Sequence, residues 1–386
     1  MSFQFFSPTK IHFGNSYRRK IGGIAKKYGG RCLIVRSEKK QKYREVFFQD
    51  IVNELEKEGI EYIVYDGVIS NPSTNIVEKG VDLAVKKEVD FIIGYGGGSA
   101  IDTAKAISLL IKNRQSSWEY VFGNLSDPFI DHNPFIKSIP LIAITTTSGT
   151  GSHVTQASVI SDLKNNEKVT LFHSTLFPKE CIVDPEIMNT VPVHVTSSTG
   201  FDALCHAFES YLNPNANRLT KTLSLQSMDI IIQILPKLIR DINNKEYREL
   251  MAYADTISGM CLSNAGAEAP HPIGEIINGY LKDLSHGETL AFVYPSFCKY
   301  IIDVIPECFE DIFRLFKFYI PEDKTLPKGD QAYYMMKNFL EDIDFLVTPY
   351  SINLDEQLKA NIKDKLVFDL PLTTADGLKE IFENSV

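Results

Sequence analysis

The first half of the chain alternates short apolar runs with longer stretches in which apolar residues recur every three or four positions. Runs of the first kind predict buried strands, and stretches of the second kind predict amphipathic helices. The predicted strands begin at residues 31, 60, 89 and 139, and the predicted helices cover 42–59, 75–88 and 100–113. Because strands and helices alternate, we expect an α/β domain with a parallel, doubly wound sheet, whose ligands bind at the carboxyl ends of the strands.

The pattern changes near residue 187. Residues 189–212, 219–242 and 249–266 have helical periodicity, and no strand pattern separates them. A chain of 386 residues also exceeds the usual size of a single hydrophobic core. We therefore predict two domains, an α/β domain over 1–186 and an all-helical domain over 187–386.

The composition disfavours several classes of function. Lys and Arg number 40 against 49 Asp and Glu, and the net charge of −9 disfavours binding to nucleic acid. The amino terminus has no basic segment followed by an apolar one, and no run approaches the ~20 apolar residues of a membrane span, so neither a signal peptide nor a membrane partner is expected. The six cysteines are scattered without CxxC spacing, which is typical of reduced thiols in a cytoplasmic protein.

Two loops rich in glycine and hydroxyl side chains follow predicted strands. In the first, GGGS at 96–99 joins a strand to a helix, whose free N–H groups attract a phosphate. This is not the GxGxxG fingerprint, and such a turn taken alone is more often structural. The second loop, TTTSGTGS at 145–152, repeats the arrangement, and two such loops in one sheet favour a dinucleotide. The candidate contacts are Gly97, Gly98, Ser99, Thr145, Thr146, Ser148 and Thr150.

Four residues of the second half have the composition of a metal site. Asp202 and His206 are one helical turn apart, so both side chains can reach a single point. His271 and His286 follow in APHPIGEIINGYLKDLSHG, on either side of a short helical stretch. One carboxylate and three imidazoles suit Fe(II) or Zn(II) better than Mg(II) or Ca(II), which prefer oxygen ligands. Glu209, one turn beyond His206, is expected to pair with a neighbouring helix instead of a metal.

The motifs GGGSAIDTAKAI, TTTSGTGS, GFDALCHAFE and HPIGEIINGYLKDLSHGE occur in this order, and together they resemble the iron-containing (group III) alcohol dehydrogenases over essentially the whole chain. The resemblance implies a dinucleotide-binding α/β domain, a helical metal-binding domain and a homodimer. It also implies hydride transfer between NAD(P)H and a small aldehyde or primary alcohol. Through the DALxHA, NAGAEAPH and HG motifs it places the metal ligands on Asp202, His206, His271 and His286. The ion would polarise the carbonyl oxygen, so we also count His271 and His286 as catalytic.

One departure from the family concerns the choice of cofactor. Relatives often carry an aspartate at the position of Ser37, where its carboxylate selects NAD(H) by repelling a 2′-phosphate. Here the hydroxyl of Ser37 is flanked by Arg36, Lys39 and Lys40, which favours NADP(H). NAD(H) stays open, because Glu38 could act as the acid.

Other charged residues receive mixed predictions. We expect Asp102 to contact the nicotinamide side of the cofactor and Lys105 to have a structural role on its helix. Lys168 matches a lysine that approaches the cofactor in relatives, although a solvated surface position suits it almost as well. Two further positions depart from the family: Glu275 stands where relatives often have a histidine near the substrate, and His153 where they commonly have glutamate.

A rival function from a different class is a metal-dependent lyase resembling dehydroquinate synthase, which shares the two-domain architecture and uses NAD transiently. Its ligands normally include a glutamate and two histidines, and its pocket is rich in Lys and Arg. Here the segment around His271 and His286 has only Lys282, which disfavours the lyase. A non-catalytic binding protein is a third alternative, which the intact set of ligands disfavours.

Overall fold

The computed structural model describes residues 2–37, 42–127, 136–348, 352 and 354–386. Contacts divide the chain into an α/β unit, Phe6–Val191 with Asn243–Ala252, and a helical unit that contains Pro192–Ile242 and Tyr253–Val386. The predicted division at 186 lies a few residues earlier, and it leaves 243–252 in the helical half. An α/β half with a parallel sheet and a helical half are both present, as the sequence predicted.

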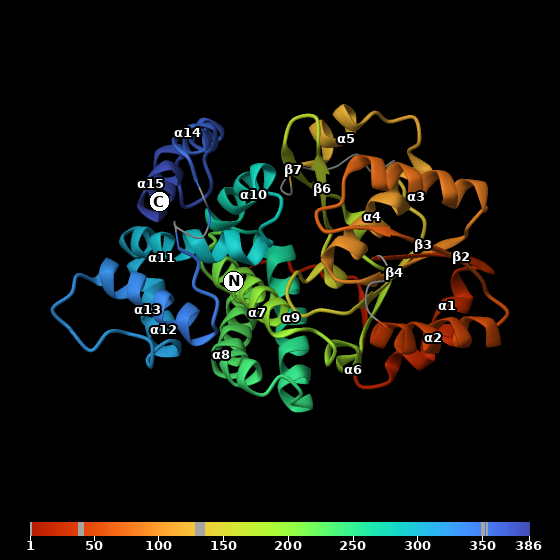
Figure 1. Cartoon of the computed structure of the whole chain (residues 1–386), viewed down its shortest axis with the longest axis horizontal. Helices are drawn as coiled ribbons and strands as arrows, with labels where there is room; N and C mark the ends of the chain where they lie inside the picture. Colours follow the sequence, from red (N-terminus) through yellow and green to blue (C-terminus); the bar gives the residue numbers. More distant parts are fainter. Residues whose placement is uncertain (1, 38–41, 128–135, 349–351, 353) are drawn as a thin grey trace. The chain divides into compact units, whose positions relative to one another are not determined.

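Six parallel strands form the sheet of the α/β unit, in the order β1-β8-β5-β4-β2-β3. Strands β2, β3 and β4 of this sheet are labelled in Figure 1. The central strands are apolar and buried on both faces, which is the pattern of a parallel sheet between two layers of helices. The strands are β1 Lys10–Phe13, β2 Arg31–Ser37, β3 Glu61–Val68, β4 Phe91–Gly96, β5 Leu141–Thr145 and β8 Glu180–Val183. Gly96 pairs in register with Thr145, so the loops after β4 and β5 start side by side.

Alternate residues of each strand face two different layers of helices. Leu33 and Val35 of β2 belong to the core that α3 and α4 cover, whereas Cys32 and Ile34 belong to the core that α1 and α2 cover. The helices of this unit are α1 Ile21–Ala25, α2 Lys42–Lys57, α3 Thr74–Lys86, α4 Gly98–Lys112, α5 Trp118–Leu125 and α6 Pro185–Met188. The predicted doubly wound sheet is therefore confirmed.

An antiparallel hairpin lies outside the main sheet and was not predicted. Its strands are β6 Ala157–Asp162 and β7 Glu167–Phe172. The hydroxyl of Ser158 donates to the backbone oxygen of Asp102 at 2.8 Å, which fastens β6 to α4. The hairpin thus belongs to the surroundings of the two glycine-rich loops.

The helical unit is built around α7, Val193–Leu212, which is buried on almost every side. Phe201 and Phe208 of this helix pack edge-to-face on Tyr294, with ring centroids 5.4 and 5.5 Å apart. The other helices of the second half are α8 Arg218–Arg240, α9 Lys245–Ala265, α10 Pro270–Tyr280, α11 His286–Val304, α12 Phe309–Leu315, α13 Lys328–Asp342, α14 Glu356–Lys365 and α15 Ala375–Ser385. Within the described ranges, no helix combines the length and the hydropathy that crossing a membrane requires.

Candidate metal and cofactor sites

Helix α7 supplies two candidate metal ligands from one face. Asp202 and His206 are one turn apart, and Nε2 of His206 lies 3.6 Å from Oδ1 of Asp202. Both residues are buried, with 3% and 5% of their surface exposed. The helical spacing that the sequence predicted therefore directs both side chains to one point inside the helical unit.

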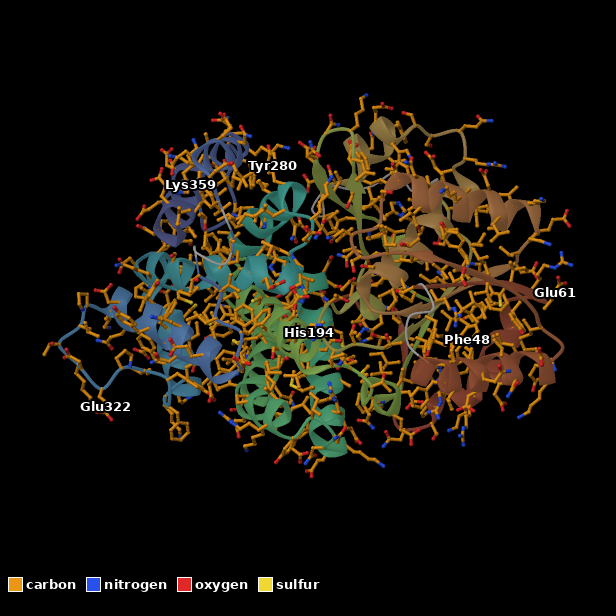
Figure 2. The ribbon with its side chains drawn as sticks, in the orientation of Figure 1. Phe48, Glu61, His194, Tyr280, Glu322 and Lys359 are labelled. Atoms are coloured by element: carbon orange, nitrogen blue, oxygen red, sulfur yellow. The ribbon has the colours of Figure 1, made fainter. Side chains whose placement is uncertain are left out.

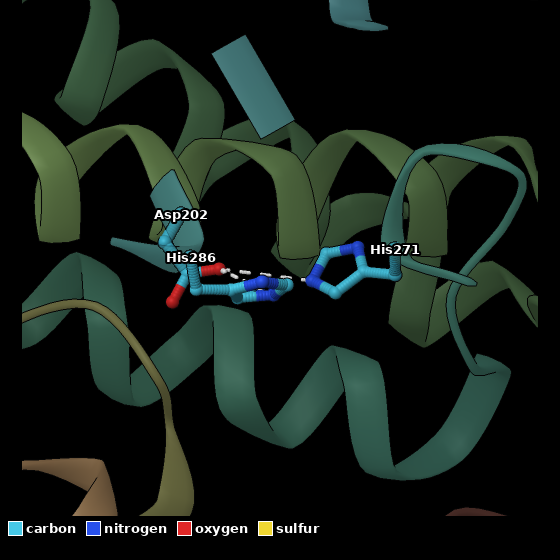
Figure 3. A group of neighbouring side chains, drawn as sticks. All are labelled: Asp202, His271 and His286. Atoms are coloured by element: carbon cyan, nitrogen blue, oxygen red, sulfur yellow. Dashed lines mark ion pairs between the residues drawn. The ribbon is translucent and has the colours of Figure 1, made fainter. Parts of the chain in front are cut away.

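Helices α10 and α11 supply the other two candidate metal ligands, His271 and His286. Pro270 is the first residue of α10, a position whose N–H would have no partner within the helix, so proline is well suited to it. His271 follows directly. Helix α11 starts at His286 because Ser285 and Glu288 form a capping box. Nε2 of His271 and of His286 lie 3.6 and 4.0 Å from the same Oδ1 atom of Asp202. Dashed lines in Figure 3 mark these ion pairs.

Asp202, His271 and His286 lie close enough together to hold one divalent transition metal ion, and His206 adjoins them. Potential ligand atoms of Asp202, His271 and His286 all lie within 4.8 Å of one another, and the ring of His206 stacks on that of His271 at 4.7 Å. Ligand atoms of a tetrahedral ion are roughly 3.4 Å apart when each bond is about 2.1 Å. The distances of 3.6 to 4.0 Å between the histidine nitrogens and Oδ1 are close to that value.

Two of these atoms have no other partner. Oδ1 of Asp202 and Nε2 of His271 are buried, and neither has a hydrogen-bond partner among the residues that the structure describes. Leaving buried polar atoms unpaired costs about 1–3 kcal/mol each. An ion at the point where these atoms converge would remove this cost, so the donor set suits a bound metal.

Glu209 orients the ring of His271 from behind. Both carboxylate oxygens lie 2.8 Å from Nδ1 of His271, and Oε2 also accepts the backbone N–H of Glu268 at 2.7 Å. A proton on Nδ1 is required for this contact, and the lone pair of Nε2 is then directed toward Asp202. As expected, Glu209 pairs with a neighbouring helix, and that helix carries a candidate ligand.

The electrostatics of the centre favour a cation. Burial by itself raises the pKa of Asp202, but the charges of His206, His286 and His271 lower it to about 2. Burial lowers the pKa of His271, yet Glu209 and Asp202 outweigh it and raise that pKa to about 10. Buried carboxylates thus stabilise positive charge at this point, whether a proton or a metal ion carries it.

Glu268 is a buried acid to which the sequence analysis gave no role. Its side chain accepts a hydrogen bond from Asn213 at 3.2 Å, and burial together with the charge of Glu209 raises its pKa to about 8. It is therefore neutral at pH 7, so it does not add a second negative charge behind His271. The sequence feature that could have revealed Glu268 is an acidic residue inside the alanine-rich segment NAGAEAPH.

The two glycine-rich loops of the α/β unit pack against each other. A Cβ atom on Gly97 would lie 3.0 Å from Oγ1 of Thr147, and one on Gly98 would lie 2.7 Å from Cγ2 of Thr150. The absence of side chains at these positions therefore serves loop packing as well as close approach by a ligand. Helix α4 begins at Gly98, so its free N–H groups lie at this point.

Hydroxyl groups of the loops differ in how they are bound. Thr145 Oγ1 donates to the backbone oxygen of Thr147 at 2.9 Å, and Ser148 Oγ makes a weak contact of 3.1 Å with the sulfur of Met188. Oγ1 of Thr146 is buried and has no hydrogen-bond partner in the described part of the chain. Ser99 is the second residue of α4, and its backbone oxygen accepts a hydrogen bond from the hydroxyl of Thr103 at 2.7 Å.

Asp102 joins α4 to the second loop and to the hairpin. Its Oδ1 accepts from Ser152 Oγ at 2.5 Å, and its Oδ2 accepts the backbone N–H of Val159 at 3.2 Å. Burial raises the pKa of Asp102 against the opposing charges of Lys105 and Lys168. The predicted nicotinamide contact of Asp102 and cofactor contact of Lys168 stay predictions.

Lys105 is structural, as the sequence predicted. It is fully buried, and its Nζ donates to Oγ1 of Thr155 at 3.1 Å and to the backbone oxygen of Ala157 at 2.7 Å. His153 is also buried, and burial together with Lys105 lowers its pKa to about 3. A neutral histidine thus stands beside this lysine. Glu275 is half-buried on α10, one turn after His271.

Ser37 ends β2 beside the first loop. It is exposed, and its Oγ lies 3.8 Å from the position of a Cβ atom on Gly96. The predicted roles of Glu38, Lys39 and Lys40 fall on residues 38–41, which lie outside the described residues.

Comparison with known proteins gives consistent matches along the chain. A family model described as iron-containing alcohol dehydrogenase matches residues 8–185, and one described as Fe-containing alcohol dehydrogenase family, C-terminal, matches residues 196–345. The NADPH-dependent butanol dehydrogenase of Clostridium saccharobutylicum is 32% identical over 297 residues, 77% of this chain and 74% of the relative. The NAD-dependent methanol dehydrogenase of Bacillus methanolicus is 28% identical over 335 residues, 87% of this chain and 85% of the relative.

A solved structure extends the match to the fold. The crystal structure of an iron-containing alcohol dehydrogenase from Thermotoga maritima superimposes with a TM-score of 0.84 and 26% identity, covering 100% of this chain and 99% of that one. The names of the two sequence relatives divide between NADPH and NAD, so similarity alone leaves the choice of cofactor open.

Proposed function

This chain belongs to the iron-containing alcohol dehydrogenase family, and from that premise we propose that it interconverts a small aldehyde and its primary alcohol with NADP(H) as the hydride carrier. Its reaction type, oxidoreduction at a CH–OH group, follows from the family. Methanol and butanol dehydrogenases among the relatives support a small substrate. The rival lyase has less support, because both of these relatives are named as dehydrogenases.

In this proposal Asp202, His206, His271 and His286 bind one Fe(II) ion, with Zn(II) as an alternative that suits the same donors. The observation that carries it is the convergence of three histidine Nε2 atoms on the otherwise unpartnered Oδ1 of Asp202. When bound, the ion supplies a Lewis acid that stabilises negative charge on the alcohol oxygen. His271 and His286 take part in catalysis as ligands.

In the proposal, other residues of the protein orient the metal ligand His271 and bind the cofactor. Glu209 keeps the proton of His271 on Nδ1 and so keeps Nε2 available. The free N–H groups at the start of α4, with Gly97, Gly98 and Ser99, bind the pyrophosphate of the cofactor. Thr145, Thr146, Ser148 and Thr150 supply hydroxyl contacts, with Asp102, Lys168 and Ser37 as further cofactor contacts. The buried and unpartnered hydroxyl of Thr146 supports this role.

The test is aldehyde-dependent consumption of NADPH by protein loaded with Fe(II) or Zn(II), across a panel of short aldehydes and ketones. Asp202→Asn and His271→Ala should lose both bound metal and turnover. His194→Ala is the matched control, because His194 is an exposed histidine on the same helix α7 (Figure 2). Absence of turnover across the panel, with metal content verified by elemental analysis, would contradict the proposal. A lyase would show no net consumption of NADPH.

We also propose a cytoplasmic homodimer. The location is supported by six cysteines that are all buried free thiols, as expected in a reducing compartment. The dimer rests on the resemblance to the family, and light scattering on the purified protein measures it directly. A monomer at micromolar concentration would contradict this part of the proposal.

A further inference from the structure

The strand order shows where a dinucleotide is expected to cross the sheet. The chain passes from β2 to β3 on one side and then returns to form β4 on the other side of β2. In open parallel sheets, ligands bind at such a reversal, outside the carboxyl ends of the two strands. At these ends Arg36 of β2 pairs in register with Tyr95 of β4, one residue before the glycines begin. Arg36 and Ser37 therefore lie at the expected crossing point.

The guanidinium of Arg36 is held in place but is only partly paired. It is 4% exposed and stacks on Phe48, with its Cζ 4.0 Å from the ring centroid (Figure 2 labels Phe48). Nη1 lies 3.0 Å from Oε1 of Glu45, a carboxylate that is itself 41% exposed. Nε and Nη2 are buried and have no hydrogen-bond partner among the described residues. These two nitrogens form one side of the guanidinium fork, so a complete bidentate edge is left without an acceptor.

A second buried arginine of the same unit shows what a structural role requires. Arg18 is 3% exposed, and its donors are shared among Asp50, Asp184 and Glu186 at 2.7 to 2.9 Å. Arg36 has the same burial and a single carboxylate partner. The difference identifies Arg36 as a buried cation that still needs an anion.

We propose that Arg36 binds the 2′-phosphate of NADP(H) through Nε–H and Nη2–H, and that it is the residue that selects this cofactor over NAD(H). The inference rests on the proposed dinucleotide binding and adds the residue that decides between the two cofactors. A phosphate monoester offers two or three oxygens that match a planar fork, whereas the ribose hydroxyl of NAD(H) would leave one donor unpaired. The contact with the ring of Phe48 restricts the movement of the guanidinium before a ligand binds.

Neighbouring residues agree with a phosphate ligand. Ser37 is exposed next to Arg36, and its uncharged hydroxyl does not repel a phosphate bound nearby. Glu45 pairs with Nη1 of Arg36 and leaves Nε and Nη2 without an acceptor. An anionic side chain in place of Ser37 would instead compete for the guanidinium of Arg36 and repel a phosphate.

Calorimetric titration of the full-length protein with two nucleotides, in the absence of substrate, tests the assignment. Adenosine 2′,5′-bisphosphate and adenosine 5′-monophosphate differ only in the 2′-phosphate, and inorganic phosphate controls for a general anion site. We expect the wild-type protein to bind the bisphosphate about 10- to 100-fold more tightly than the monophosphate. Arg36→Met keeps the packing on Phe48 and should abolish this preference while leaving the monophosphate affinity within about twofold; Arg36→Lys should keep part of it.

Surface variants keep the test decisive if Arg36→Met does not fold. Ser37→Asp should lower the affinity for the bisphosphate at least about tenfold, and Glu45→Gln should leave it unchanged or increase it. A wild-type protein without preference, or an Arg36→Met variant that retains it, overturns the assignment. Weak binding of both nucleotides overturns the assignment together with the proposed dinucleotide site. Because turnover is not measured, a failure of the proposed aldehyde reduction leaves this result intact.

Discussion

Replacing Glu209 with glutamine perturbs the metal centre through one contact. Glu209 is fully buried, and both of its oxygens face Nδ1 of His271 at 2.8 Å. Glutamine keeps the size and one acceptor oxygen but removes the negative charge. The hydrogen bond to Nδ1 then becomes a neutral one, and Nε2 of His271 becomes a weaker ligand.

Loss of such an outer partner usually lowers metal affinity 10- to 100-fold, which corresponds to ~1.4–2.7 kcal/mol. Both oxygens of Glu209 lie 2.8 Å from Nδ1 of His271, and Glu209 itself is fully buried. We therefore expect at least a tenfold loss of affinity for Glu209→Gln. Glu209→Ala should lose more, because it also leaves the backbone N–H of Glu268 unpaired.

Competition between the metal-free protein and a chelator measures the Zn(II) or Fe(II) affinity of each variant. Asp229→Asn, which changes an exposed carboxylate on α8, is the control and should match the wild-type protein. An affinity for Glu209→Gln within twofold of wild type would refute the reasoning. So would a loss as complete as that of Asp202→Asn, since it would mean that Glu209 binds the ion directly.

Three further predictions concern the α/β unit. Gly98→Ala places a methyl group 2.7 Å from Cγ2 of Thr150, so cofactor affinity measured by calorimetry should fall about tenfold while metal affinity stays constant. Asp102→Asn weakens the charged contacts to Ser152 and β6, so urea unfolding should show a loss of about 1.5–3 kcal/mol; an unchanged midpoint would contradict this. Burial lowers the pKa of Lys105 from 10.5 to about 8, and between these values the unfolded chain binds a proton that the folded chain does not. The contribution of Lys105 to the free energy of unfolding should thus rise by about 1.4 kcal/mol per pH unit in this window and be lost as the pH falls through 8; a Lys105→Met variant showing the same rise would contradict it.

The regular elements of the α/β half were predictable because their periodicity is local. The central strands are continuous apolar runs, α2 and α3 each have one apolar face, and α4 is buried on nearly all sides. The hairpin of β6 and β7 was not predicted, because a buried Ser158 interrupts the alternation of β6. Burial of Ser158 is possible because the backbone oxygen of Asp102 accepts a hydrogen bond from its hydroxyl, and this partner is distant in sequence.

The candidate metal centre was also predictable only in part. The pairing of Asp202 with His206 follows from helical spacing, because both residues are on α7. The approach of His271 and His286 depends on how three helices pack, so the resemblance to a family was needed to join them to the first pair. The contact of Glu209 with a neighbouring helix was predicted, but its partner His271 was not.

The unpaired donors of Arg36 could not be predicted from the sequence. Arg36, Lys39 and Lys40 around Ser37 suggested an attraction for phosphate, whereas the feature that the structure adds is the unpaired edge of Arg36, Nε and Nη2, beside the ring of Phe48. The mutual packing of the two loops through Gly97 and Gly98 could not be predicted from the sequence either, because it depends on the register between β4 and β5. Both features arise from neighbours far apart along the chain.

Titration of metal-free protein with Fe(II) under anaerobic conditions, with aldehyde-dependent NADPH oxidation followed at every step, tests the central claim most directly. The account predicts that activity rises in proportion to bound iron and saturates at one ion per chain. Asp202→Asn should not bind a stoichiometric amount of iron and should show no activity. His194→Ala should match the wild-type protein in both bound iron and activity. Activity that is independent of bound iron, or stoichiometric iron binding by Asp202→Asn, would contradict the account.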